Sequence, residues 1–354
     1  MEETLSTIKK NNVGNSYDIL KFVMALLIVA IHTQAFEGPF ACNVFKPFLE
    51  VAVPVFFILS SMFFFTKLRR ENLRWKQLKH FLLRLGLLYF FWFIVNIVFV
   101  EHEHRYFIDA GIMDIFRLIK DVLLRSTYSG SWFFSALGLS VATYTMIYKQ
   151  RWLLFLLFII SLIGFVYIHE IDYIPEQLHG LYKWWQSNVR EEVTLSILEA
   201  LPWVGVGYFL SSDRIQTWMS TIKEKNKPIL LHLLFLVLVL VCLINYNYGY
   251  KPLQLLIRFV IVLYLITLAG TSRLTPKPIY FEMRKMSVLF FMLHFVAIKI
   301  WSLLGTYVLH LDSWQEHIGN MGFYFLILAS CLVISICILY LQNKKQFNWL
   351  KYSC

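Results

Sequence analysis

Residues 17–36, YDILKFVMALLIVAIHTQAF, decide the fold because they form an apolar run long enough to cross a bilayer. A hydrocarbon core about 30 Å thick needs about 20 predominantly apolar residues in a helix. The run is too long for the core of a signal peptide, and no small-residue cleavage site follows it. We therefore expect it to be kept as a first membrane-spanning helix.

Nine similar runs follow this first one. Of the 354 residues, 58% are hydrophobic and only 16% charged, whereas soluble domains are about 45–50% apolar and about 25% charged. This composition excludes a soluble globular enzyme and predicts an all-α, polytopic membrane helix bundle. We expect a single transmembrane domain over residues 1–354, with no appended soluble domain. The ten predicted spans are residues 17–36, 51–66, 81–100, 131–148, 152–168, 195–211, 228–246, 253–270, 286–305 and 322–342.

The basic residues predict the orientation of these spans. The formal net charge is +11, and 21 of the 33 Lys and Arg residues lie in the two tails and the even-numbered connections. Eight lie in the connections on the other face, and four lie within spans. By the positive-inside rule both termini are cytoplasmic. The positive charge is thus explained by topology and contact with membrane lipid headgroups, which removes the reason to expect a nucleic-acid partner. The five cysteines show neither a disulfide framework nor metal-ligand spacing, so we expect no metal.

Charged and polar residues inside a membrane are costly and often mark function. In the first span, Lys21 and His32 are eleven residues apart, roughly 16 Å along one face of a helix. This spacing suits a long anionic molecule that enters from the cytoplasm, with its charged head near Lys21 and its reactive end near His32. In the alternative interpretation, Lys21 extends to the interface and His32 makes an interior hydrogen bond.

The loop at residues 67–84, KLRRENLRWKQLKHFLLR, is densely basic at the same cytoplasmic mouth. Cations at this density can hold phosphates, although topology and headgroup contact would also account for them. Later in the chain, His294 lies at mid-membrane depth, where it either lines a cavity or bridges helices. Arg258 and Glu199 both fall toward the outer half of their spans, either as an ion pair or as a binding pair for a hydroxylated substrate.

Motifs in chain order carry a family resemblance. The first span has an acidic residue, a basic residue three positions later and a histidine eleven further on, in Asp18, Lys21 and His32. The second span reads VPVFFILSS at 53–61, and the third begins with Arg84 and Tyr89. SGSWFFSAL at 129–137 and FFMLHF at 290–295 follow. In this order the motifs resemble the acyltransferase-3 family of integral membrane acyltransferases over nearly the whole chain. Lys21 replaces the commoner Arg, and Ser61 stands where Gly is usual.

The resemblance implies an enzyme that transfers acyl groups other than aminoacyl groups. Acyl-CoA, most often acetyl-CoA, would donate from the cytoplasm to a hydroxyl of a cell-surface or lipid-linked glycan at the outer face, a polysaccharide modification. It also implies a bacterial inner membrane. His32 is the candidate catalytic base, or a transient acyl carrier. The candidate cofactor-binding residues, which would hold the CoA phosphates, are Lys21, Arg69, Arg70, Arg74 and Arg84. The candidate acceptor-binding residues are Trp132, Ser131, Glu199, Arg258 and His294.

Two other functions fit parts of the pattern. A transporter or flippase for a lipid-linked or anionic solute would use the same charges to line its path, usually with repeat symmetry or broken helices in matching halves, which the sequence does not clearly show. A non-catalytic scaffold would leave the spacing of Lys21 and His32 without a purpose.

Overall fold

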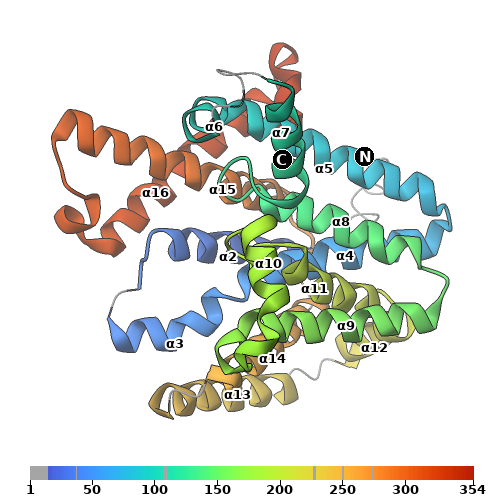
Figure 1. The fold of residues 1–354 in the computed structure, drawn as a ribbon. Helices are drawn as coiled ribbons and strands as arrows, with labels where there is room; N and C mark the ends of the chain where they lie inside the picture. The colour runs from blue at the N-terminus through green and yellow to red at the C-terminus, as the bar shows by residue number, and fades with distance from the viewer. Residues whose placement is uncertain are drawn as a thin grey trace. The chain divides into compact units, whose positions relative to one another are not determined.

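A computed structural model describes residues 15–36, 38–104, 106, 111–225, 229–248, 251–272 and 274–354. Every regular element within these ranges is helical (Figure 1), which confirms the all-α fold. Seven of the described helical stretches are long and apolar enough to cross a membrane, and two shorter apolar helices, Ile197–Leu210 and Leu233–Ile244, accompany them. The protein is therefore an integral membrane protein, and the count of ten spans stays a prediction.

A helix covers most of each predicted span. In chain order these helices are α2 (Asn15–His32), α4 (Ala52–Glu71), α5 (Arg74–Val95), α8 (Trp132–Met146), α9 (Arg151–His169), α11 (Ile197–Leu210), α13 (Ile229–Tyr248), α14 (Lys251–Thr271), α15 (Pro278–Leu303) and α16 (Trp314–Leu341). The connections contain the further helices α3 (Pro39–Leu49), α7 (Ile112–Leu124), α10 (Gly180–Asn188) and α12 (Asp213–Lys225). The helix α6 (Ile97–His104) begins within the third predicted span and ends in the connection after it.

The helices group into two compact units. The first combines the chain up to Phe56 with the segment Asp213–Cys354, and the second is Phe57–Ser212. The helix α4 therefore contributes its first residues to one unit and the remainder to the other. The expectation of a single transmembrane domain stays a prediction.

In the first unit, α2 packs along α15. Leu20, Met24 and Ile28 of α2 are buried at spacings of four residues, which places them on one face of the helix. Pro278 begins α15, where its fixed φ favours a helical start and its missing N–H leaves no donor unpaired. On α16, by contrast, Val333 is 60% exposed in the isolated chain, as expected of a side chain that faces lipid.

In the second unit, α11 packs against α8 and α9. Ser196 caps the start of α11, where its hydroxyl accepts a hydrogen bond from the Leu198 amide at 3.3 Å. Trp203 on this helix is fully buried and meets the Phe165 ring edge-on at 5.4 Å between centroids. Large rings thus anchor α11 in its unit, and its glycines leave space for close helix contacts.

Candidate active site

The helices α2 and α15 run in the same direction and meet at three levels. At the first level, Asp18 of α2 pairs with Arg284 of α15. Further along both helices the rings of Phe22 and Phe290 meet, with centroids 5.5 Å apart. At the last level, His32 lies beside His294. This order makes the two helices parallel and sets a charged end and an imidazole end on one helix pair.

The charged end is built around a buried carboxylate. The side chain of Asp18 is 3% exposed and accepts two hydrogen bonds from Arg284, from Nε and Nη2, each at 2.7 Å. Such a bidentate pair fixes both position and orientation. Half-buried Lys21 follows one turn along α2, so this end of the helix pair carries two cations close to one anion.

The imidazole end joins two histidines that lie 262 positions apart in the sequence. The centroids of the His32 and His294 rings are 5.1 Å apart, and their planes are inclined by 31°. The Phe295 ring lies 4.5 Å from His32 and 3.9 Å from His294, again between centroids. His32 is exposed on its other side, whereas His294 is fully buried. Only His32 of the pair is therefore open to a substrate in this conformation.

The predicted cytoplasmic cations belong to the second unit, around the turn between α4 and α5. Arg69 is engaged there, because its Nε donates to Ser211 Oγ at 3.1 Å and its Nη2 to the Tyr208 carbonyl at 3.3 Å. Its guanidinium also lies 4.7 Å from the Tyr208 ring centroid. This set of contacts ties the end of α4 to the end of α11, and the binding of the donor by Arg69 stays a prediction.

The other three arginines of this turn are less constrained. The Arg70 side chain is 76% exposed, with its Nη2 3.6 Å from Glu71. Arg74 begins α5 and lies 4.3 Å from the Trp75 ring centroid, and Arg84 is exposed two to three turns further on. Arg70 and Arg84 are exposed and Arg74 is partly exposed, so a phosphate can reach these guanidinium groups.

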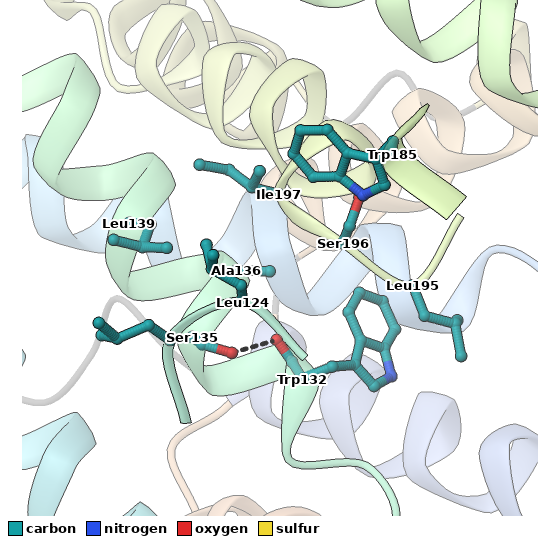
Figure 2. Close-up of a pocket in the computed structure, with 10 residues that line it drawn as sticks. Leu124, Trp132, Ser135, Ala136, Leu139, Trp185, Leu195, Ser196 and Ile197 are labelled. Carbon is teal, nitrogen blue, oxygen red and sulfur yellow. Dashed lines mark hydrogen bonds between the residues drawn. The ribbon is translucent and has the colours of Figure 1, made fainter. Parts of the chain in front are cut away.

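A pocket lies in the second unit among α7, α8, α10 and the start of α11 (Figure 2). Its cavity volume is about 10 Å³, room for about one water molecule. The indoles of Trp132 and Trp185 and the hydroxyls of Ser135 and Ser196 line it, and the remaining lining is apolar. Ser135 donates a hydrogen bond to the Trp132 carbonyl at 3.1 Å. This volume is too small for a sugar ring in this conformation, and the binding of an acceptor at Trp132 stays a prediction.

The amphipathic helix α7 forms one wall of this pocket. Tyr106 donates to Asp121 Oδ2 at 2.5 Å. Burial, together with this hydrogen bond and the charge of Asp121, raises the pKa of Tyr106 above its usual range, so the phenol stays protonated and keeps donating. Lys120 donates to the Asn188 carbonyl at 2.6 Å, which ties α7 to the end of α10.

The comparisons with known proteins identify the chain's family. The model of the acyltransferase-3 family, described as an acyltransferase domain, matches residues 15–340. The chain belongs to the acyltransferase-3 family. No curated protein and no solved structure matches it. The match supports a membrane acyltransferase that transfers groups other than aminoacyl groups, as the sequence predicted.

In this acyltransferase-3 protein, two of the predicted acceptor residues have partners within their own units. Glu199 accepts a hydrogen bond from the Trp203 indole at 3.3 Å and lies 2.6 Å from His169 Nε2. Arg258 is in the other unit, where its Nη2 is 3.1 Å from Glu50. Each of the two charges is thus paired locally, and their role in binding the acceptor stays a prediction.

Ser131 is fully buried in the turn before α8. Its hydroxyl accepts from the amides of Thr127 at 3.0 Å and Tyr128 at 3.3 Å, and it lies 2.7 Å from the Ser126 hydroxyl. These bonds shape the turn that places Trp132 at the pocket. The binding of an acceptor by Ser131 itself stays a prediction.

Sequence reasoning missed Arg284, the partner of Asp18. It counted Arg284 only among the cations of a cytoplasmic connection, although Arg284 precedes His294 by ten residues much as Lys21 precedes His32 by eleven. That parallel spacing was the available signal. In the part of this acyltransferase-3 chain that the structure describes, no group of three or more His, Cys, Asp or Glu residues could hold a metal ion.

Proposed function

We propose that this membrane acyltransferase moves an acyl group, acetyl in the first instance, from cytoplasmic acyl-CoA to a hydroxyl of a cell-surface or lipid-linked glycan at the outer face. The observation that carries the proposal is the exposed imidazole of His32 at one end of α2, with Lys21 and the Asp18–Arg284 pair at the other. A bacterial inner membrane is the proposed location.

The proposed reaction needs one positioned base. His32 takes the proton from the acceptor hydroxyl as the hydroxyl oxygen attacks the thioester carbonyl carbon. The new C–O bond forms, the C–S bond breaks, and the CoA sulfur leaves with the proton that His32 returns to it. A base in this position typically contributes about 10²–10⁴-fold to the rate. The balanced products are the O-acyl ester and free CoA.

The donor is proposed to bind by its phosphates. Lys21 lies roughly 16 Å along α2 from His32, a distance that an extended pantetheine arm can bridge. Arg70 and Arg84 are exposed and Arg74 is partly exposed, and their guanidinium forks are proposed to bind the phosphates. Arg69 is proposed to bind the donor with them, and its bonds to the end of α11 hold its guanidinium in place.

The acceptor is proposed to be a saccharide that packs against the indole of Trp132, which requires the side chains around that indole to move apart. An indole face packs well against the C–H groups of a sugar ring, and hydroxyls beside it supply hydrogen bonds. The match to an acyltransferase family favours this reaction over the transport of a lipid-linked or anionic solute.

The test is mass spectrometry of base-labile acetyl esters on surface glycans. Cells that lack the protein are complemented with the wild type, with His32→Ala, or with His317→Ala, which removes an exposed histidine of α16 as a matched control. We expect the esters to return with the wild type and His317→Ala but not with His32→Ala, at equal protein levels in the membrane. Esters that never depend on the protein, or full rescue by His32→Ala, would contradict the proposal.

A further inference from the structure

The protonation of His294 is fixed by its own helix. Its Nδ1 lies 3.0 Å from the carbonyl oxygen of Phe290, four residues earlier on α15. A carbonyl oxygen only accepts, so Nδ1 carries the hydrogen and donates it. A neutral imidazole has one N–H, which leaves Nε2 with a lone pair and no hydrogen.

This lone pair is buried and lacks a donor. His294 is fully buried, and its Nε2 has no hydrogen-bond partner among the residues that the structure describes. A buried acceptor without a donor costs about 1–3 kcal/mol. The aromatic rings that contact His294 are those of Phe291, Phe295 and His32. Of these three rings, only that of His32 carries an N–H group.

The tautomer of His32 matters for the proposed reaction. Its ring must present a bare nitrogen to the acceptor hydroxyl, which requires the hydrogen to sit on the other nitrogen. No side-chain hydrogen bond within the described ranges holds His32 in that tautomer. Its ring centroid is 5.1 Å from that of His294, so a small rotation of the exposed side chain can bring one ring nitrogen within hydrogen-bond reach of His294 Nε2.

We propose that His294 is a positioning residue: its Nε2 accepts the ring N–H of His32 and so aims the other nitrogen of His32 at the acceptor hydroxyl. The inference rests on the proposed function and assigns His294 a role other than the substrate contact expected from the sequence. His294 gains no proton during the reaction. The proton taken from the hydroxyl stays on His32, and the N–H toward His294 stabilises the imidazolium until the proton passes to the CoA sulfur.

Two variants of His294 separate positioning from packing. His294→Gln keeps an acceptor on a side chain long enough to face His32, whereas His294→Leu fills the space without one. We expect His294→Leu to lower kcat for acetyl transfer by about 10²–10⁴-fold, the range seen when a catalytic histidine loses its orienting partner. The KM values for acetyl-CoA and for the acceptor should stay within about threefold of the wild-type values. The kcat of His294→Gln should be at least tenfold higher than that of His294→Leu.

A second measurement does not depend on activity. Diethyl pyrocarbonate reacts with an unprotonated, accessible imidazole nitrogen, so its rate at His32 reports whether a bare nitrogen is presented outward. Peptide mass spectrometry of the full-length protein in detergent follows His32, with exposed His310 as the internal reference. We expect the ratio of the His32 rate to the His310 rate to fall several-fold in His294→Leu and to recover in His294→Gln.

Equal loss of kcat in both variants, with unchanged labelling of His32, would overturn the proposal. A rise in the KM of His294→Leu for the acceptor at constant kcat would also overturn the proposal. That result would instead support the role in acceptor binding that the sequence predicted for His294. If the wild type shows no acetyl transfer at all, the proposed function fails, but the labelling ratio still decides whether His294 orients His32.

Discussion

At the scale of single residues, the Asp18–Arg284 pair has unequal partners. The Asp18 side chain is 3% exposed, whereas 43% of the Arg284 side chain remains accessible. A charge that is left unpaired costs most where water cannot reach it. Removal of the arginine should therefore harm the fold more than removal of the carboxylate charge.

We predict that Arg284→Gln lowers the free energy of unfolding by about 3–5 kcal/mol, since it leaves the Asp18 carboxylate buried and unpaired. Asp18→Asn should cost less, about 1–3 kcal/mol, because Arg284 can still reach water. Thermal unfolding of the purified protein in detergent measures both. The double variant should be more stable than Arg284→Gln alone, and an equal or larger loss for Asp18→Asn would contradict this account.

The sequence supplies the spacing within a helix but not the partner across helices. Lys21 and His32 could be placed on one face of a helix because helical periodicity is local. The partners of Asp18 and His32 lie more than 260 positions away, on α15. The only local sign of that pairing is the similar spacing of Arg284 and His294 to that of Lys21 and His32, so Arg284 was missed and His294 was predicted as an independent residue.

At the scale of helices, Gly207 on α11 leaves space for Ser61 on α4. The Ser61 hydroxyl donates back to the Phe57 carbonyl at 2.8 Å. A Cβ on Gly207 would lie 2.6 Å from the Ile58 carbonyl oxygen and closer still to the Ser61 hydroxyl. The missing side chain of one helix therefore makes room for the extra hydroxyl of the other.

We predict that Gly207→Ala destabilises the protein by about 1–3 kcal/mol, because the new methyl group meets backbone atoms of α4 that cannot rotate away. Gly164→Ala on α9 is the matched control, since a Cβ there has nothing within 4 Å. It should leave stability unchanged or raise it by about 0.5–1 kcal/mol. Both are measured by thermal unfolding in the same detergent, and a similar loss in the two variants would contradict the close contact.

The predicted spans fall on helices because apolar content over about 20 residues is a local signal. The irregular backbone was not predicted. Gly319 lies at a φ of 72° inside α16 and kinks it, a conformation that glycine adopts without strain. Gly319, Asn320 and Gly322 lie close together in the sequence, but glycine and asparagine also occur within regular helices, so they did not by themselves predict the kink.

At the scale of the whole molecule, the parallel contact of α2 and α15 constrains the topology. Two spans that run in the same direction across a membrane must be separated by an odd number of crossings. The second to eighth predicted spans lie between α2 and α15 and supply seven. The parallel direction of α2 and α15 is consistent with seven intervening spans, as with any odd number, and the total of ten stays a prediction.

We accordingly predict that both termini face the cytoplasm. With ten spans, and with 21 Lys and Arg residues on one face against eight on the other, a fluorescent protein fused after Cys354 should fluoresce in a bacterial host, and alkaline phosphatase fused there should be inactive. Phosphatase inserted after Leu311, between α15 and α16, should be active, because this connection lies on the opposite face and carries no Lys or Arg. The two phosphatase positions control for each other, since α16 alone separates them. Active phosphatase at the C-terminus together with inactive phosphatase at Leu311 would show that the topology is the reverse of the predicted one. The reversed topology would place His32 and the acyl acceptor on the cytoplasmic side.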